Sequence, residues 1–216
     1  MLTIEKTVLP SPEQWEIIIE GLRNPMNSWD KMDSYKTWIE DHETRETADF
    51  EFFVGENDQK LMESLAKGGP VHAKYRRMIP VFLTINAPLY WWKEMDRYRV
   101  GVEMNSCSTM HKIHAKEFTL DDFSHEHLFD MPTLGKIIEA LNWWRSEFLD
   151  TKKKIYWWQM IQLLPTSYNQ KRTVMLNYEV LVNIYHSRKN HKLDEWHTFC
   201  DWIEGLPYSE LITGEA

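Results

Sequence analysis

Residues 78–86, MIPVFLTIN, are the most strand-like run in the sequence, and Pro88 follows them almost directly. A run of this length that is rich in β-branched and aromatic residues predicts a strand. Pro80 cannot donate a backbone hydrogen bond, which favours an edge strand or an early position within the strand. Pro88 is tolerated in a first helical turn, and Trp92 and Met95 follow at helical spacing. The chain must therefore pass from a strand into a helix within a few residues.

Other segments give clear helix or strand signals. Ser11-Pro12-Glu13-Gln14 combines a Ser cap, a Pro in the first turn and a Gln at the capping-box position, which predicts a helix start. Residues 26–56 give no clear pattern. Helices are expected over residues 133–163, broken near Asp150, over 178–187 and over 194–204; extended segments are expected over 2–8 and 168–177. The expected fold class is α+β, with helices around a few mostly antiparallel strands, in a single domain spanning residues 1–216.

Charge and cysteine content narrow the function classes. The net charge of −8 argues against binding DNA or RNA as a polymer, because there is no basic excess to displace counterions. This net charge is still compatible with a local basic pocket that binds one small phosphate. Cys107 and Cys200 are the only cysteines in the sequence, which excludes a disulfide framework and a thiolate metal cluster. No apolar run approaches membrane-spanning length, and no signal-peptide core is found near the N-terminus. We expect a cytoplasmic protein without a membrane partner.

Tryptophan is abundant, and six of the 11 occur as the adjacent pairs Trp91-Trp92, Trp143-Trp144 and Trp157-Trp158. Neighbouring residues on a helix point about 100° apart, so one narrow core stripe does not easily hold both members of a pair. Either these helices are buried on two sides, or one member of a pair faces a partner subunit. We favour an oligomer.

The helix that follows Pro88 leads into a candidate ligand site. Arg97-Tyr98-Arg99 carries two permanent cations, and Asn105, Ser106 and Ser108 follow as small hydrogen-bonding residues. Cations followed by hydroxyl and amide groups suit an anionic, planar ligand such as a nucleotide. The alternative is a surface helix whose arginines pair with nearby acidic residues, namely Glu94, Asp96 and Glu103.

Two other kinds of site involve the residues around Ser108. His111 and His114 could share a helical face, but a metal ion would need a third ligand from elsewhere in the chain. Ser106, Cys107 and Ser108 lie near His111, which could indicate a nucleophile and its base, although no orienting acid is implied. The sequence contains neither a G-x-G-x-x-G motif nor a P-loop, which disfavours a Rossmann dinucleotide site.

The central stretch resembles the signature of flavin-dependent thymidylate synthases. That signature is an Arg-His-Arg triplet followed by a serine inside an Asn-Glu-x-Ser-x-Arg-Tyr run. Here the triplet is Arg97-Tyr98-Arg99, and residues 105–111 read NSCSTMH, with one extra residue between the two halves. Flanking residues stand in the family order over residues 72–114 and 160–200: His72, the strand 78–86 and Pro88 upstream, and Leu164-Pro165, Asn177, Asn183, Arg188 and His191 downstream.

The resemblance implies a homotetramer whose FAD and deoxyuridylate sites lie where subunits meet. NADPH would reduce the FAD, and the methylene of methylenetetrahydrofolate would pass to C5 of dUMP, giving dTMP without an enzyme nucleophile. By resemblance, the FAD contacts are His72, Arg97, Tyr98, Arg99, Asn177, Asn183 and His191. The nucleotide contacts are Glu94, Arg97, Ser106, Ser108 and Arg188, and the catalytic set is Arg97, Ser108 and Arg188.

Several positions depart from the family pattern, and five of them bear on the ligand site. Glu94 replaces a glutamine, Ser106 replaces a glutamate, and arginines are replaced at Met110, Ile161 and Glu179. A carboxylate at position 94 accepts from an amino group where uracil offers a carbonyl, which favours a cytosine-like base. The alternatives are therefore a flavoenzyme of the same fold acting on another pyrimidine nucleotide, such as a cytidine nucleotide, and a non-catalytic oligomeric nucleotide-binding protein.

Overall fold

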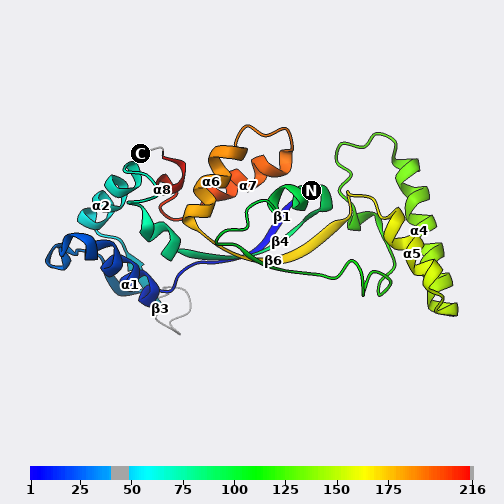
Figure 1. Cartoon of the computed structure of the whole chain (residues 1–216), viewed down its shortest axis with the longest axis horizontal. Coiled ribbons are helices and arrows are strands. Elements are labelled where there is room, and N and C mark those ends of the chain that lie inside the picture. The colour runs from blue at the N-terminus through cyan, green and yellow to red at the C-terminus, as the bar shows by residue number, and fades with distance from the viewer. Residues whose placement is uncertain (40–48, 215–216) are drawn as a thin grey trace. The chain divides into compact units, whose positions relative to one another are not determined.

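The computed structural model describes residues 1–39 and 49–214 as an α+β protein with an antiparallel sheet and flanking helices (Figure 1). The expected fold class is thereby confirmed. The chain forms two compact units. Unit 1 contains residues 1–6, 83–99 and 104–174, and unit 2 contains residues 7–82, 100–103 and 175–216.

The main sheet has four strands in the order β1 (Thr3–Val8), β4 (Pro80–Pro88), β6 (Asn169–Asn177) and β5 (Glu103–Ser106). The sequence predicted β1, β4 and β6 to within about two residues, whereas β5 was missed. Pro80 is the first residue of β4, where its missing N–H group costs no ladder bond. β4 is an internal strand, so the early-position interpretation of Pro80 is the correct one and the edge interpretation is wrong.

Unit 1 contains α3 (Leu89–Met95), the short 3-10 helix η4 (Leu120–Asp122), α4 (Met131–Thr151) and α5 (Lys154–Leu163). Helices α4 and α5 pack side by side (Figure 1). The chain breaks between them at Lys152, which has a left-handed φ of 57° and caps α4. The predicted break near Asp150 is therefore confirmed. Apolar side chains fill the space beside the two helices: Ile113, Phe118, Phe123, Leu134, Leu141 and Met160.

Unit 2 begins with α1 (Pro12–Arg23), whose Ser11 hydroxyl accepts from the Gln14 N–H group while the Gln14 side chain bonds back to Ser11. The predicted capping box is confirmed. The 3-10 helix η1 (Asn24–Met26) follows α1. Residues 26–56, which show no clear pattern in the sequence and lie partly outside the described residues, contain the 3-10 helix η2 (Trp29–Lys31). They also contain the antiparallel strands β2 (Tyr35–Ile39) and β3 (Asp49–Phe53).

The rest of unit 2 is helical and packs around one buried helix. It comprises α2 (Glu56–Lys67), the 3-10 helix η3 (Lys74–Met78), α6 (Tyr178–Arg188), α7 (Asp194–Glu204) and α8 (Glu210–Thr213). Helix α6 contacts η3, α7 and α8, which bury Leu181, Ile184 and Tyr185. Because α6 is apolar on several sides, most of its polar residues lie where neighbouring helices leave it open, and Glu179 is the buried exception among those described.

The tryptophan pairs have different environments. Trp91 and Trp92 are both fully buried, because α3 is covered on two sides. Trp143 and Trp158 are 55% and 40% exposed on the α4–α5 pair. The first pair therefore belongs to the core. In each of the other two pairs one tryptophan is exposed and available for a subunit contact, so the oligomer stays a prediction. Among the described residues, no helix combines the length and apolar character needed to cross a membrane.

Candidate functional site

The arginine triplet lies directly after α3, in the turn that leaves the helix. Arg97 contacts Glu94 at 3.2 Å, and its side chain remains 68% exposed. The Arg99 Nε–H group donates to the backbone carbonyl of Asp96 at 3.1 Å, which caps the end of α3. The pairing with an acidic side chain expected from the sequence is observed for Arg97 with Glu94, whereas Arg99 contacts a backbone carbonyl and the Asp96 carboxylate pairs with Arg172. Most of the Arg97 side chain still faces solvent and is accessible to an anion.

A third guanidinium group, that of Arg172 on β6, supports this turn. It lies 4.3 Å from the centre of the Trp92 ring and donates to the Asp96 carboxylate at 2.7 Å. Its Nε–H group donates to the Gln170 side chain at 3.0 Å. Only 15% of the Arg172 side chain is exposed, so this cation is neutralised and held in place. Arg172 therefore fixes the segment before Arg97 and is not a free phosphate ligand.

The loop that carries Ser108 is tied to the same strand. The Cys107 N–H group donates to the Lys171 carbonyl at 2.9 Å, and the Gln170 amide donates to the Cys107 carbonyl at 2.7 Å. The Ser108 hydroxyl accepts from the His111 N–H group at 2.8 Å and from the Met110 N–H group at 3.3 Å. These bonds form a tight polar turn and use Ser108 as a backbone acceptor.

The turn geometry does not support the alternative sites near Ser108. His111 meets Ser108 through its backbone and not through its imidazole ring. Across the described part of the chain, no group of three metal-ligating side chains is found. Ile161, at a position where the family has an arginine, packs against the apolar cluster of unit 1. An apolar side chain at that position is explained by core packing.

In unit 2, α6 displays the predicted polar residues from end to end. The Asn177 side chain caps the helix by accepting from the Val180 N–H group at 3.1 Å. The Asn183 amide donates to the Glu179 carbonyl one turn back, also at 3.1 Å. At the last turn of α6, the Arg188 guanidinium lies 4.9 Å from the centre of the Trp196 ring, and this contact holds the guanidinium group in place.

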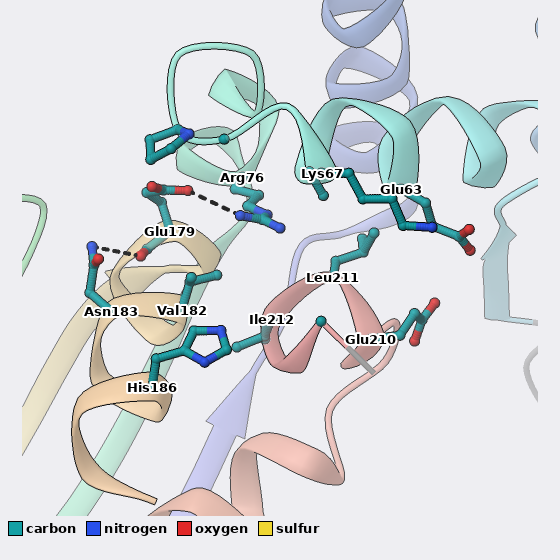
Figure 2. Close-up of a pocket in the computed structure, with 14 residues that line it drawn as sticks. Glu63, Lys67, Arg76, Glu179, Val182, Asn183, His186, Glu210, Leu211 and Ile212 are labelled. Atoms are coloured by element: carbon teal, nitrogen blue, oxygen red, sulfur yellow. Dashed lines mark hydrogen bonds and ion pairs between the residues drawn. The ribbon is translucent and has the colours of Figure 1, made fainter. Parts of the chain in front are cut away.

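A cavity of about 300 Å³ lies between α2, η3, α6 and α8 (Figure 2). Arg76 from η3 and Glu179 from α6 line it and form an ion pair at 3.6 Å, with both side chains 9% exposed. Arg76 was not predicted as a site residue, because it lies in the basic run 72–77 and such runs are usually solvated. Glu179 replaces a family arginine, and Arg76 supplies the opposite charge beside it.

The predicted FAD contacts of unit 2 do not share one cavity. Asn183 lines the cavity of Figure 2. His72 lines a second cavity of about 510 Å³, together with Leu22 and Tyr75. His191 lines a third, of about 430 Å³, beside Cys200. Burial raises the pKa of Tyr75 to about 12, so its phenol stays protonated and donates to the Met62 carbonyl at 2.8 Å.

The chain matches known proteins through its three-dimensional structure. No protein-family model matches the chain, and no curated protein matches it significantly. Among solved structures, thymidylate synthase X (ThyX) from Helicobacter pylori with FAD and dUMP superposes with a TM-score of 0.67 at 14% identity, covering 99% of this chain and 96% of that chain. The chain has the ThyX fold.

A second neighbour of this chain is the UMP/dUMP methylase PolB from Streptomyces cacaoi bound with 5-Br dUMP. Its TM-score is 0.63 at 13% identity, and the match covers 99% of this chain and 94% of that one. The resemblance inferred from residues 72–114 and 160–200 is therefore confirmed for the fold and extends over nearly the whole chain.

Proposed function

We propose that this protein is a flavin-dependent enzyme that adds a one-carbon unit to C5 of a pyrimidine nucleotide. In its simplest form the reaction converts dUMP to dTMP with FAD as cofactor and methylenetetrahydrofolate and NADPH as co-substrates. The observation that carries the proposal is the ThyX fold, matched over 99% of the chain to an enzyme solved with FAD and dUMP. Fold alone does not determine chemistry, so the site residues must also fit.

The donor groups near α3 fit the charged part of FAD. The exposed Arg97 side chain lies 3.2 Å from the Glu94 carboxylate, and Arg99 donates to a backbone carbonyl through Nε. Both guanidinium groups retain N–H donors for a diphosphate or for the pyrimidine end of a flavin ring. When bound, FAD supplies the hydride chemistry. We assign Tyr98, Asn177, Asn183, His72 and His191 to orienting the cofactor, shared between neighbouring copies of a homotetramer.

For the nucleotide we assign Ser108, Ser106 and Arg188, with Arg97 at the reacting ring. The turn at Ser108 is fixed to β6 through Cys107, and Arg188 is steadied by the Trp196 ring. Preorganised groups of this kind lose little conformational freedom when a ligand binds. Arg97, Ser108 and Arg188 then position the base and stabilise negative charge on it.

A second candidate substrate is favoured by Glu94. Its carboxylate replaces the family glutamine and lies on the last turn of α3, with a quarter of its side chain exposed. A carboxylate accepts hydrogen bonds and cannot donate, so it pairs with the amino group of cytosine better than with a uracil carbonyl. The PolB neighbour, described as a UMP/dUMP methylase, adds a ribonucleotide to the set worth testing.

The first test is the absorption spectrum of freshly purified protein, which should show a flavin band. The second is tritium release from C5-labelled dUMP, measured beside dCMP and UMP with methylenetetrahydrofolate and NADPH present. Tritium release from dUMP alone supports thymidylate synthesis. Release from dCMP or UMP would identify that nucleotide as a substrate. A colourless protein that neither binds added FAD nor releases tritium would indicate the non-catalytic alternative.

A further inference from the structure

Gln170 on β6 contacts the structures on both sides of the Arg97 and Ser108 turns. Its Nε2 group donates to the Cys107 carbonyl at 2.7 Å, and its Oε1 atom accepts from the Arg172 Nε–H group at 3.0 Å. The residue is only 6% exposed. A buried polar group that loses its partner is costly, so this side chain is held firmly in one orientation.

These contacts belong to one continuous chain of hydrogen bonds within unit 1. Arg172 lies two residues further along β6, on the same face as Gln170, and donates to the Asp96 carboxylate at 2.7 Å. Asp96 caps the end of α3 and directly precedes Arg97. At the other end of the chain of bonds, Cys107 directly precedes Ser108. The chain of bonds therefore runs from the turn that carries Arg97 to the turn that carries Ser108.

An amide side chain suits the middle of this chain of bonds for a chemical reason. A guanidinium group can only donate and a backbone carbonyl can only accept, so the group between Arg172 and Cys107 must offer an acceptor on one side and a donor on the other. A carboxylate at position 170 would place an acceptor against the Cys107 carbonyl, and a thioether would offer no N–H donor. Replacing Gln170 therefore breaks the connection between the two turns.

We propose that Gln170 is a positioning residue, which sets the separation of the Arg97 and Ser108 turns so that both contact one bound nucleotide. This inference rests on the proposed function, which assigns Arg97 to the reacting ring and Ser108 to the nucleotide. Gln170 touches no ligand and acts only through these two turns. A misplacement of about 1 Å in a positioning group can cost about a hundredfold in rate, so the separation of the turns matters even when every ligand contact is retained.

The test is a double-mutant cycle, measured by titration calorimetry of the FAD-loaded full chain with dUMP. Gln170→Met keeps the length of the side chain but releases the Ser108 turn, and should weaken dUMP binding about tenfold. In a Ser108→Ala background the same change should weaken binding less than about twofold, because its route to the ligand is already gone. Equal losses in the two backgrounds would overturn the proposal, since a general loss of structure acts independently of Ser108.

The control variant is Gln162→Met, the same change at an exposed glutamine of α5. It should leave the affinity for dUMP unchanged. Thermal melts establish that each variant folds. If FAD-loaded Gln170→Met turns over, its kcat should fall with the flavin content unchanged, because the cofactor is bound but the nucleotide is misplaced.

A measurement without ligand tests the connection itself and does not require Gln170→Met to fold. Asp96→Asn weakens the end of the chain of bonds that is remote from Ser108, at a side chain that is 45% exposed and tolerates the change. Hydrogen exchange of the peptide 107–111, followed by mass spectrometry, should quicken at least about threefold. Asp150→Asn, the same change at an exposed carboxylate of α4, should leave it unaltered. Unaltered exchange in Asp96→Asn would overturn the proposal.

Failure of this inference is distinguishable from failure of the proposed function. A native protein that binds neither FAD nor a pyrimidine nucleotide, yet shows faster exchange in Asp96→Asn, refutes the function and supports the connection between the turns. A protein that binds FAD and dUMP but gives equal losses in the two backgrounds keeps the function and refutes the role of Gln170.

Discussion

The guanidinium group of Arg172 stacks on the Trp92 ring, with 4.3 Å between the central carbon and the ring centre. Trp92 in turn donates through its indole N–H group to the Gln170 carbonyl at 2.9 Å. Together with the ion pair to Asp96, these contacts join β6 to the end of α3 within unit 1. The position of the Arg97 turn therefore depends on a stacked, paired arginine that is itself outside the proposed ligand contacts.

Replacing Arg172 by Lys removes the planar group that stacks and pairs at once. We expect a loss of about 1–2 kcal/mol in the free energy of unfolding, because an ammonium group cannot reproduce both contacts. Urea denaturation followed by tryptophan fluorescence measures it. Lys171→Met removes the neighbouring exposed pair with Glu5 and should cost less than about 1 kcal/mol. Equal losses in the two variants would contradict the role given to stacking.

We expect the free energy of unfolding to depend on pH through the carboxyl group of Asp58. Burial raises its pKa, but hydrogen bonds from Ser34, Asp33 and Arg23 outweigh burial and hold the pKa below its ordinary value of 3.8. A carboxylate with a lowered pKa in the folded state contributes stability that is fully present above pH 3.8. That contribution is lost as the pH falls through the lowered value.

The Asp58→Asn variant isolates this contribution. At pH 7 it should lose about 3 kcal/mol or more, because the buried Arg23 guanidinium, 2.7 Å away, is left without its counter-charge. The gap from the native protein should narrow as the pH falls below 3.8 in urea titrations. A gap that stays constant down to the acid transition would show that the carboxylate charge is not what Asp58 contributes.

Arg97→Ala should lose bound FAD while the oligomer persists. The side chain is 68% exposed and has little part in packing, so its removal acts on the ligand and not on the fold. The ratio of flavin to protein absorbance, with size-exclusion chromatography and light scattering, reports both properties. Lys93→Ala, a nearby exposed cation on α3, serves as the control and should keep its flavin. Unchanged flavin content in Arg97→Ala would refute the assignment.

Glu94→Gln restores the family residue and should move base preference toward uracil. An amide can donate to a carbonyl, whereas a carboxylate cannot, so we expect the ratio of tritium release from dUMP to that from dCMP to rise about tenfold or more. The comparison of ratios within one preparation cancels differences in flavin loading. If the ratio is unchanged, Glu94 serves only as the partner of Arg97.

Gly101 approaches the proposed cofactor residue Asn177. Its φ is +76°, and a Cβ atom there would lie 3.0 Å from the Asn177 amide nitrogen. Gly101→Ala should therefore cost about 1–2 kcal/mol and disturb the cap of α6. Gly135→Ala in α4 meets nothing within 4 Å and should raise stability by about 0.5–1 kcal/mol. Thermal melts compare the pair, and a neutral Gly101→Ala would show that the turn relaxes freely.

Much of the fold could be predicted from patterns of residues that are adjacent in the sequence. Ser11 with Gln14 marked the start of α1, and the run before Pro88 marked β4, because capping and strand signals are contained in adjacent residues. Strand β5 has four residues, too few to show alternation, and β2 with β3 are stabilised by pairing with each other. Such pairing depends on distant residues that a local pattern cannot represent.

For the site, the sequence by itself determined the residue types: paired arginines after a short helix, a hydroxyl-rich turn, and polar residues spaced along a later helix. Only the tertiary structure decided their partners. It placed Arg172 on Trp92, set Arg76 against Glu179, and distributed Asn183, His72 and His191 among different cavities. The reason is physical: a charge pair or a cavity forms between segments far apart in the chain, and its energy depends on burial, which folding alone creates.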